Sequence, residues 1–348
     1  MSEIRISIKN LYKVFGAAPD SMVELVQNGV SKADLLKDHG HVLGLNNINI
    51  DIPARGIQVI MGLSGSGKST LIRHINRLIE PTAGEVIVDG RDVLGFNEVE
   101  LRQFRRFTTS MVFQKFALMP HHTIAENVAY GLEIQGVGAD EVKRRSGKWI
   151  ERVGLAGFED HYPAQLSGGM QQRVGLARAL ATDAEILLMD EAFSALDPLI
   201  RTDMQEMLLD LQQELHKTIV FITHDLDEAL HIGDQIAILR DGLIVQKGTT
   251  PEIILSPADD YVADFTKDIN RARVLKVGAI MEAGTLTEGP MIDKSSVIEE
   301  ALQVISGAGA SSAVVTENAK PVGSVSLETM ILAIARREAQ NKGSEAYL

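Results

Sequence analysis

Apolar and polar residues follow one another along most of the chain in a pattern that predicts an α/β fold. Alternation predicts strands at 4–9 and 45–52, and uninterrupted apolar runs predict buried strands. Further strands are expected at 57–61, 85–88, 110–113, 185–190, 218–223, 235–239 and 242–247. Helical periodicity is clearest at 69–76 and 199–216. Strands that alternate with helices indicate a parallel sheet with helices on its faces.

A pair of short helices is predicted between the first two strands. Residues 19–40 contain two patterns that resemble capping boxes, one beginning at Ser21 and the other at Ser31. In such a pattern the serine hydroxyl accepts a backbone N–H bond and opens a helix. Gly29 and Gly40 provide the ends, because glycine adopts the left-handed conformation that closes a helix. We therefore interpret 19–40 as a helical insert.

The alternation of strands and helices is interrupted a second time in the middle of the chain. Residues 98–107 are basic and helical in pattern, and 123–165 are mostly helical with no strand among them. A further strong helical run covers 171–181. We therefore predict that a helical subdomain, at about 115–180, is inserted in the α/β core.

The last part of the chain, residues 277–348, is rich in alanine and glycine and is acidic. Its pattern predicts a helix, two strands and a second helix, at 296–305, 313–316, 322–325 and 327–336. Short helices up to about residue 267 are expected to close the preceding domain. The sequence thus predicts a first domain at 1–267 and a small α/β module at 277–348.

Composition limits the function classes. The chain has 348 residues and a formal net charge of −13. Binding to nucleic acid requires a basic surface, so nucleic acid is not expected as the main partner. The absence of cysteine excludes disulfides and thiolate metal sites. The sequence shows no signal peptide and no apolar run long enough to span a bilayer. A protein partner would have to hold the chain at a membrane.

The run at 62–69 reads G-x-x-x-x-G-K-S, the pattern of a phosphate-binding loop. It stands between a predicted strand and a predicted helix, which is the context that the motif requires. Its glycines allow the backbone N–H groups to converge on a phosphate at the helix N-terminus. In this motif Lys68 contacts the β- and γ-phosphates and Ser69 binds Mg²⁺.

Other polar residues stand at the ends of predicted strands. Gln114 follows one strand, Asp190 and Glu191 end another, and His224 follows a third. Ligands of an open α/β sheet bind beyond the carboxyl ends of its strands. These side chains and the phosphate-binding loop are therefore expected to meet in one place. A second glycine-rich segment, 166–169, opens a predicted helix and provides a second anion site.

In these motifs and in their order, residues 4–267 resemble the ATP-binding-cassette (ABC) ATPases. The resemblance implies that Ser69, Gln114 and Asp190 organise Mg²⁺, and that Asp190 does so through water. It makes Glu191 the general base and His224 the residue that clamps the γ-phosphate, so Glu191, His224 and Gln114 form the catalytic set. ATP would be bound within one chain by Phe15, Gly62, Ser64, Gly65, Ser66, Gly67, Lys68, Ser69, Thr70 and Asp190.

The resemblance also implies a homodimer that sandwiches two ATP molecules. Ser167, Gly168 and Gly169 would bind the γ-phosphate of the ATP held by the other subunit, and Asp197 would contact that subunit. Met170 departs from the family's commonest signature, which has glutamine there.

Two interpretations of single residues remain open in the sequence. Phe15 matches the aromatic residue that stacks on adenine, although Tyr12 is a rival and either ring could belong to the core. His121 and His122 are adjacent on a loop, which is weak evidence for a metal site.

Several segments narrow the resemblance to one type of importer. The segment 115–127 resembles the surface that holds a coupling helix of a membrane subunit. The insert 19–40 and the runs 41–44, 60–67, 166–173 and 189–197 narrow the resemblance further. Together they resemble the ATPases of quaternary-amine importers for glycine betaine, proline betaine or choline, which serve osmoprotection. The implied partners are a second copy of the chain, two integral-membrane permease subunits and, indirectly, a substrate-binding protein. The implied location is the cytoplasmic face of the inner membrane, as a peripheral protein.

The module at 277–348 resembles a single cystathionine-β-synthase-type (CBS) unit, on the runs 277–281, 292–293, 299–302 and 321–325. Adenine-nucleotide binding, ionic-strength sensing and dimer stabilisation all remain open for it. Its predicted helix carries an apolar stripe that we expect to exceed what the module can bury, and hence to pair with the module of a second subunit. The stripe consists of Val297, Ile298, Ala301, Leu302 and Ile305.

Three alternative functions remain. The chain could energise the import of another small solute, such as an amino acid. It could be an ABC ATPase outside transport, although that class favours two cassettes in one chain, long coiled coils or a basic surface. It could also be a ligand-sensing regulator built around the C-terminal module.

Overall fold

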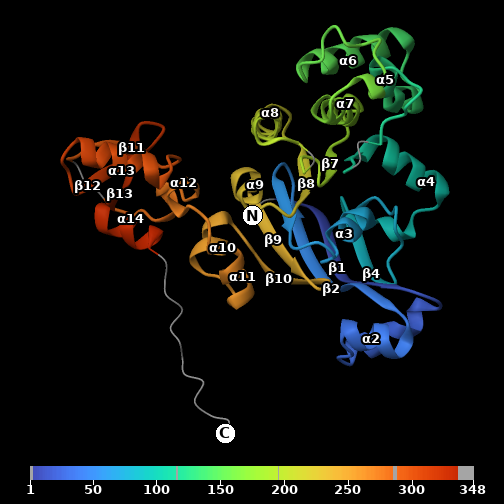
Figure 1. The fold of residues 1–348 in the computed structure, drawn as a ribbon, viewed down its shortest axis with the longest axis horizontal. Helices are drawn as coiled ribbons and strands as arrows, with labels where there is room; N and C mark the ends of the chain where they lie inside the picture. The colour runs from blue at the N-terminus through green and yellow to red at the C-terminus, as the bar shows by residue number, and fades with distance from the viewer. Residues whose placement is uncertain (1–2, 115–116, 195, 285–287, 336–348) are drawn as a thin grey trace. The chain divides into compact units, whose positions relative to one another are not determined.

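The computed structural model describes residues 3–114, 117–194, 196–284 and 288–335. The chain divides into two compact units, Met1–Lys247 and Gly248–Leu348 (Figure 1). The division comes earlier than the boundary that we predicted after residue 267. The short helices α10 (Thr250–Leu255) and α11 (Asp260–Phe265), which we assigned to the first domain, belong to the second unit.

An antiparallel sheet forms one layer of the first unit. Its strand order is β2-β1-β4-β5. The bounds are β1 (Ile4–Phe15), β2 (Val42–Pro53), β4 (Ala83–Val88) and β5 (Arg91–Asp92). The long hairpin of β1 and β2 pairs Ile8 with Ile50 and, at its far end, Phe15 with Val42. The predicted strands at 4–9 and 45–52 are thus confirmed and are longer than the alternation indicated.

A six-stranded sheet, in the order β10-β9-β3-β8-β7-β6, forms the second layer. Its strands are β3 (Ile57–Met61), β6 (Thr109–Val112), β7 (Ile186–Asp190), β8 (Thr218–Thr223), β9 (Gln235–Arg240) and β10 (Leu243–Gly248). From β9 to β6 the neighbouring strands are parallel. All residues of β3, β7 and β8 are buried, which is why each reads as a mostly apolar run.

The helix that follows β3 joins the two layers. In α3 (Lys68–Ile75), Leu71, Ile72 and Ile75 are fully buried in a core shared with both sheets. The other helical segments of this α/β part are η2 (Val93–Gly95), α4 (Glu98–Gln103), the π-helical turn η3 (Phe104–Thr108), α8 (Pro198–Leu215) and α9 (Leu226–Ile232). The core therefore fixes the start of α3, where the phosphate-binding loop ends.

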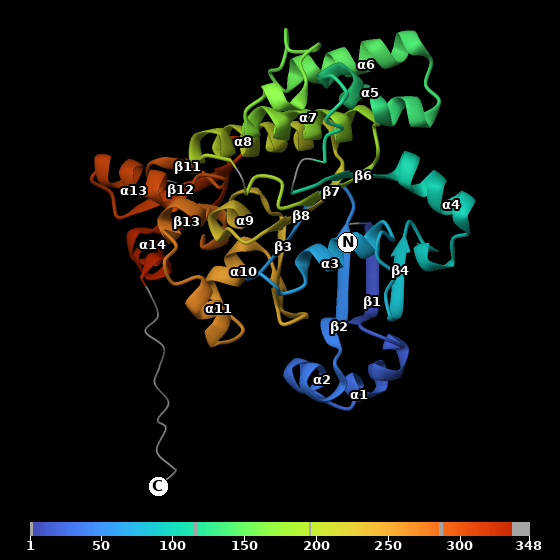
Figure 2. The same cartoon turned by 45° about the vertical axis from the view of Figure 1, so that its right-hand side comes forward.

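The predicted helical subdomain is present as a group of helices beside the sheets (Figure 2). It contains α5 (Ile124–Gln135), α6 (Ala139–Arg152), η4 (Pro163–Gln165) and α7 (Gly168–Ala181). The three α-helices pack on one another. Thr123 opens α5 with a capping box that also uses Glu126. Residues 115–116 of the predicted docking segment 115–127, and residue 195 of the run 189–197, lie outside the described residues.

The insert at 19–40 is helical as predicted. It contains η1 (Pro19–Met22), α1 (Val23–Gln27) and α2 (Lys32–His39). Ser31 caps α2 as expected, since its hydroxyl accepts from the backbone N–H of Asp34. The predicted cap at Ser21 is wrong. Pro19 starts the helical turn earlier, so Ser21 lies inside that turn and donates to the carbonyl of Ala18.

The second unit contains a three-stranded sheet in the order β11-β12-β13. Its remaining elements are α12 (Arg271–Val274), η5 (Val277–Ala279), β11 (Met291–Asp293), α13 (Ile298–Gly307), β12 (Ser312–Glu317), β13 (Lys320–Ser326) and α14 (Leu327–Ile334). The predicted helices and strands of this part are confirmed, and β11 is added. The part of the predicted module from residue 336 on lies outside the described residues.

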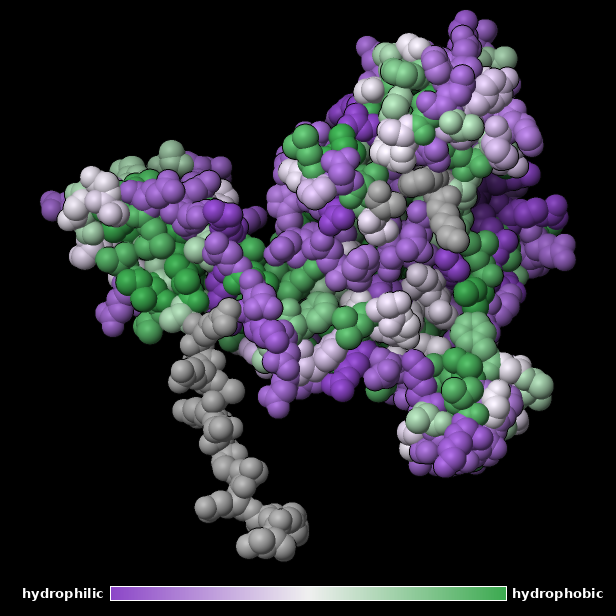
Figure 3. Space-filling model, in the orientation of Figure 1, coloured by the Kyte–Doolittle hydropathy of each residue, from purple (hydrophilic) through white to green (hydrophobic). Residues whose placement is uncertain are grey.

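The apolar stripe that we expected to stay uncovered is mostly buried. Ile298, Ala301 and Ile305 are fully buried, because α13 packs against α12 and α14. The exposed apolar side chains of this unit are others, and Figure 3 shows hydrophobic residues gathered on the visible face of the unit. They include Met291 at 69%, Val304 at 43%, Ile331 at 54% and Leu332 at 67% exposure.

Candidate functional site

The phosphate-binding loop lies between β3 and α3, as predicted. Three of its glycines, Gly62, Gly65 and Gly67, have φ angles of 152°, 79° and 106°. At two of them a side chain would also collide with the backbone. A Cβ on Gly62 would lie 2.2 Å from the carbonyl oxygen of Leu239, and one on Gly67 would lie 2.6 Å from that of Gly44. The loop can keep its curled path only with glycine at these positions.

Lys68 begins α3 and is buried, with 4% of its surface exposed. Its Nζ donates to the carbonyl oxygens of Gly62 and Leu63 at 2.8 and 3.1 Å and lies 3.6 Å from Glu191 Oε1. Burial lowers the pKa of Lys68, and the negative charges of Glu191 and Asp190 oppose that shift. The ammonium group is thus held over the loop, beside the carboxylates at the end of β7.

Asp190 ends β7 and is 1% exposed. Its Oδ1 accepts a hydrogen bond from Ser69 Oγ at 2.7 Å. Its Oδ2 accepts one from Arg73 Nη2 at 3.0 Å. The prediction that Ser69 and Asp190 meet is confirmed. Arg73, which belongs to no predicted motif, is a new member of the group.

Glu191 contacts the other two side chains that stand at the ends of strands. Gln114 Nε2 donates to Glu191 Oε2 at 2.8 Å, and His224 Nδ1 lies 3.6 Å from the same oxygen. Glu191 itself has a φ of 47° and donates its backbone N–H to the carbonyl of Ile222. The left-handed backbone turns the chain as it leaves β7. Four elements thus bring a lysine, a histidine and a glutamine to one carboxylate at the carboxyl edge of the sheet.

Of the two candidate adenine-stacking rings, only one is accessible. Tyr12 is 7% exposed and belongs to the small core that holds the insert, with Val14 and Leu35. Phe15 is 40% exposed at the end of β1, and its ring lies 2.7 Å from where a Cβ on Gly44 would be. The glycine therefore makes room for the Phe15 ring beside the phosphate-binding loop.

Comparison with known proteins agrees with this geometry. Residues 45–194 match the family model described as ABC transporter. The glycine betaine transport ATP-binding protein OpuAA of Bacillus subtilis is 53% identical over 292 residues, which cover 83% of this chain and 70% of that protein. The chain belongs to the ABC transporter family, as one of its ATP-binding proteins. It is an ATPase of that family.

Two further comparisons extend the match. The trimethylamine N-oxide transport ATP-binding protein TmoW of Pelagibacter ubique is 44% identical over 341 residues, 97% of this ABC protein and 99% of the relative. A solved dimeric ATP-binding cassette in a post-hydrolysis state, bound to ADP and Pi, is 32% identical with a TM-score of 0.61. That match covers 70% of this chain and 98% of the solved one. The predicted ABC core is thus confirmed.

The signature of this ABC protein lies on another helix. Ser167 is the N-cap of α7, and its hydroxyl accepts from the backbone N–H of Met170 at 3.3 Å. Ser167 and Gly168 are exposed, and a Cβ on Gly169 would lie 3.0 Å from the Ile200 side chain. Asp197 caps α8 by accepting from the backbone N–H of Ile200. Ser167, Gly169 and Asp197 thus each have a local structural role in the single chain.

The residues present fit both ATP and a magnesium ion. Ser66 Oγ is buried in the loop and, among the described residues, has no hydrogen-bond partner. An orphaned hydroxyl in a phosphate-binding loop suits a phosphate ligand. Ser69 and Asp190 present hydroxyl and carboxylate oxygens, and Gln114 adds an amide, which are the ligand types that Mg²⁺ takes. His121 and His122, the weak metal candidates, are both exposed.

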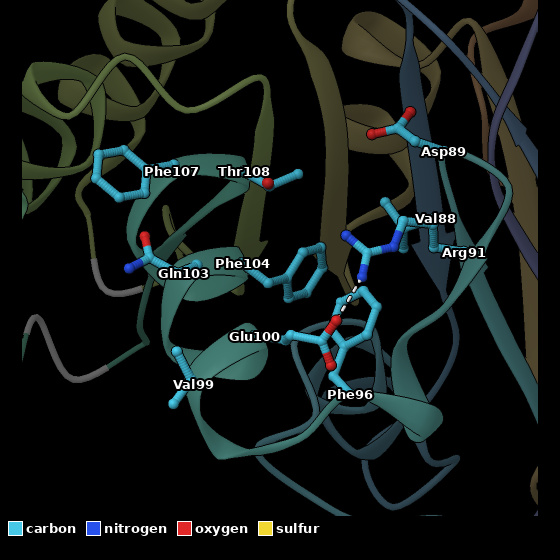
Figure 4. Close-up of a pocket in the computed structure, with 10 residues that line it drawn as sticks. All are labelled: Val88, Asp89, Arg91, Phe96, Val99, Glu100, Gln103, Phe104, Phe107 and Thr108. Atoms are coloured by element: carbon cyan, nitrogen blue, oxygen red, sulfur yellow. Dashed lines mark hydrogen bonds and ion pairs between the residues drawn. The ribbon is translucent and has the colours of Figure 1, made fainter.

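A separate apolar hollow lies beside α4 (Figure 4). It has a volume of about 440 Å³ and lies among Phe96, Phe104 and Phe107. Arg91 and Glu100 form an ion pair of 2.9 Å at the hollow. None of its lining residues is a predicted site residue, so it is distinct from the nucleotide site.

The sequence alone did not reveal two contacts of the site. Arg73 stands four residues after Ser69, and this helical spacing was the one available signal. Lys32 of the insert lies 3.4 Å from the carbonyl oxygen of Gly65 and 3.8 Å from Asp241 Oδ1. Lys32 and Gly65 are 33 residues apart, and no local sequence pattern predicts a contact over that separation.

Proposed function

We propose that this ABC ATPase energises the import of small quaternary ammonium compounds, with glycine betaine, proline betaine and choline as the leading substrates. The observation that carries the proposal is the assembly of Lys68, Gln114 and His224 around Glu191, next to the Ser69–Asp190 pair. The substrate class is supported by the relatives, whose names refer to glycine betaine transport.

Within one subunit, the loop at 62–69 and Thr70 hold the phosphates. The backbone N–H groups and Lys68 supply the positive field that phosphoryl transfer needs. Ser69, Gln114 and Asp190 would hold Mg²⁺, which would neutralise charge on the phosphates. Phe15 stacks on adenine, a role that its exposed ring supports and that the burial of Tyr12 argues against.

Glu191 acts as the general base. Its carboxylate accepts a proton from the attacking water, which typically contributes about 10²–10⁴-fold to a rate. Gln114 and His224 contact the carboxylate oxygen Oε2, so both can orient it. His224 then clamps the γ-phosphate, and the imidazole is 53% exposed and accessible for that role.

Two subunits close the site. Ser167, Gly168 and Gly169 lie at the exposed N-terminus of α7, where a helix dipole favours a phosphate. They serve the ATP of the opposite subunit, and Asp197 contacts that subunit. A homodimer therefore holds two ATP molecules.

Transport requires membrane partners. None of the helices within the described ranges is long and apolar enough to cross a bilayer. We propose that two integral-membrane permease subunits hold the ATPase at the cytoplasmic face of the inner membrane, and that a substrate-binding protein delivers the solute. We propose that the permease subunits dock on the segment 115–127, of which the structure describes residues 117–127.

Trimethylamine N-oxide is the second candidate substrate. It is favoured by one observation: the relative named for its transport matches 97% of this chain and 99% of its own length. The glycine betaine relative of Bacillus subtilis matches over 70% of its own length. Both solutes carry a methylated, positively charged nitrogen, so the two proposals share one chemical class.

Solute uptake by the whole transporter tests the proposal. The chain would be produced with its co-purifying permease and binding protein in cells that lack other uptake systems for these solutes. ATP-dependent uptake of labelled glycine betaine is expected, and uptake of labelled trimethylamine N-oxide is measured in parallel. Uptake of labelled trimethylamine N-oxide without uptake of glycine betaine would favour the second candidate. Uptake of neither amine would contradict the substrate class.

The second unit is proposed to be a single CBS-type module from 277 to 348. Its three-stranded sheet and two flanking helices support an independently packed module. Regulation by adenine nucleotide or ionic strength and stabilisation of the dimer are the candidate roles. A chain that ends before the module and transports without responding to ionic strength would favour the sensory role.

A further inference from the structure

One face of α3 holds both oxygens of the Asp190 carboxylate. Ser69 Oγ bonds Oδ1 at 2.7 Å, and Arg73 Nη2 bonds Oδ2 at 3.0 Å. Ser69 and Arg73 are four residues apart, so their side chains leave the helix in the same direction. The carboxylate is therefore oriented at both ends by a helix that begins in the phosphate-binding loop.

The charges at this place form two pairs. Lys68 lies 3.6 Å from Glu191, and Arg73 lies 3.0 Å from Asp190. In the protein without nucleotide or metal, the positive charges of Lys68 and Arg73 balance the negative charges of Glu191 and Asp190. Asp190 is almost completely buried, and a buried carboxylate without a partner is strongly destabilising. The Ser69 hydroxyl is neutral and cannot compensate the negative charge of Asp190, whereas Arg73 can.

We propose that Arg73 is a positioning residue for the metal-binding carboxylate. Its bond to Oδ2 leaves Oδ1 directed at Ser69, and its positive charge opposes the binding of a free divalent cation to Asp190. Ser69 and Asp190 would then hold a magnesium ion only together with the nucleotide, whose phosphates would add the missing negative charge. This inference rests on the metal-binding role of Ser69 and Asp190 proposed above.

The surroundings of Arg73 make it suitable for substitution. Its side chain is 40% exposed, so a replacement does not open the core. Only Nη2 contacts the carboxylate, while Nε is buried and has no hydrogen-bond partner among the described residues. Methionine keeps much of the aliphatic stem and removes the charge. Lysine keeps the charge and loses the planar group.

Calorimetric titration of MgCl₂ into the nucleotide-free full chain measures the effect directly. Arg73→Met is expected to bind free Mg²⁺ at least about tenfold more tightly than the unchanged protein, because a nearby repulsive charge is gone. Arg73→Lys should resemble the unchanged protein. Arg102→Met is the matched control, since Arg102 donates to the Glu98 carbonyl of its own helix. Equal Mg²⁺ affinity in Arg73→Met and Arg102→Met would overturn the inference.

Asp190→Asn separates this inference from the proposed metal site. Added to Arg73→Met, it should abolish the gained Mg²⁺ binding. If the gain persists in the double variant, the cation binds elsewhere and both the inference and the proposed role of Asp190 are wrong. If Arg73→Met does not fold, Asp190→Asn should restore folding by removing the unpaired charge, and failure of that rescue would also overturn the pairing.

Discussion

Gln114 Nε2 donates a hydrogen bond of 2.8 Å to Glu191 Oε2, across two neighbouring strands of the parallel sheet. The donor follows β6, the edge strand, and the acceptor follows β7. Gln114 therefore links Glu191, the proposed general base, to the strand from which the chain continues into the helical subdomain.

Replacement of Glu191 by glutamine is expected to keep ATP binding and stop turnover. The amide cannot accept the proton of the attacking water, so kcat should fall by about 10²-fold or more. ATP hydrolysis in the complete transporter gives the rate, and size-exclusion chromatography with ATP should show a trapped dimer. An unchanged rate would contradict the role of Glu191 as base.

Ser167→Arg should prevent ATP-driven dimerisation and leave the ATP affinity of the single chain nearly unchanged. The reason is that Ser167 is exposed and contacts its own helix start, not the phosphate-binding loop of its own chain. Sedimentation of the Glu191→Gln background with ATP measures the dimer, and equilibrium binding in dilute protein measures affinity. Equal losses of affinity in monomer and dimer would contradict a role across the interface.

Lys32→Ala should weaken ATP binding by a few-fold and leave kcat unchanged. Lys32 contacts Gly65 of the phosphate-binding loop and Asp241, and a partly exposed ion pair of this kind contributes roughly 0.2–1 kcal/mol. The KM for ATP is the measurement. Lys37→Ala, on the same helix and exposed, is the control that should change nothing.

His74 is expected to make the first unit less stable below about pH 6. The side chain is fully buried in α3, and burial lowers its pKa from 6.5 to about 4. Between these values the unfolded chain binds the extra proton, so stability rises with pH through this window and is fully present above 6.5. The effect is about 1.4 kcal/mol for each pH unit within the window.

Urea unfolding at pH 7.5 and 5.5 tests this expectation. The unchanged protein should lose more stability on acidification than His74→Gln does. The difference isolates His74, because the other titrating groups are common to both proteins. Parallel losses in the two proteins would show that another group dominates the pH dependence.

The second unit is expected to pair with its counterpart in the ATP-bound dimer. Its exposed apolar residues on α14, Ile331 and Leu332, replace the stripe on α13 as the surface to be covered. The chain has no cysteine, so Leu332→Cys gives a single thiol for cross-linking. Cross-linking with a short bifunctional reagent should require ATP and should fail for Glu300→Cys, an exposed position on α13. Equal yields for both would contradict specific pairing.

The parallel sheet was the most predictable part of the fold. The strands Ile57–Met61 and Thr218–Thr223 occur at the predicted residues, because burial on both faces leaves a run of apolar residues with sharp ends. The strand Met291–Asp293 was missed, since three residues, of which only Ile292 is buried, carry no periodic signal. The stripe on α13 was identified correctly as apolar, but its partners α12 and α14 are set by tertiary packing.

In the candidate site, too, the sequence predicted the motifs but not the contacts that depend on tertiary packing. Motifs placed Lys68, Gln114 and Glu191 at strand or helix ends, and sheet topology then brings them together. Arg73 and Lys32 were not found, because each pairs with a residue that is distant in sequence or in another motif. Such pairs depend on how the helices pack on the sheet. Local sequence patterns do not determine that packing.

The helical insert leaves the β1–β2 hairpin and returns to it at facing positions. Phe15 pairs with Val42, and the His41 ring bridges the carbonyl oxygens of Ala17 and His39 at 2.5 and 2.6 Å. Residues 16–41 are therefore an elaboration of a hairpin tip, and their length is independent of the strand register. A protein engineer could attach a fluorescent reporter to an exposed position of α2 without changing the pairing of β1 with β2. Because α2 contacts the phosphate-binding loop, a reporter placed there would sense nucleotide occupancy from outside the catalytic machinery.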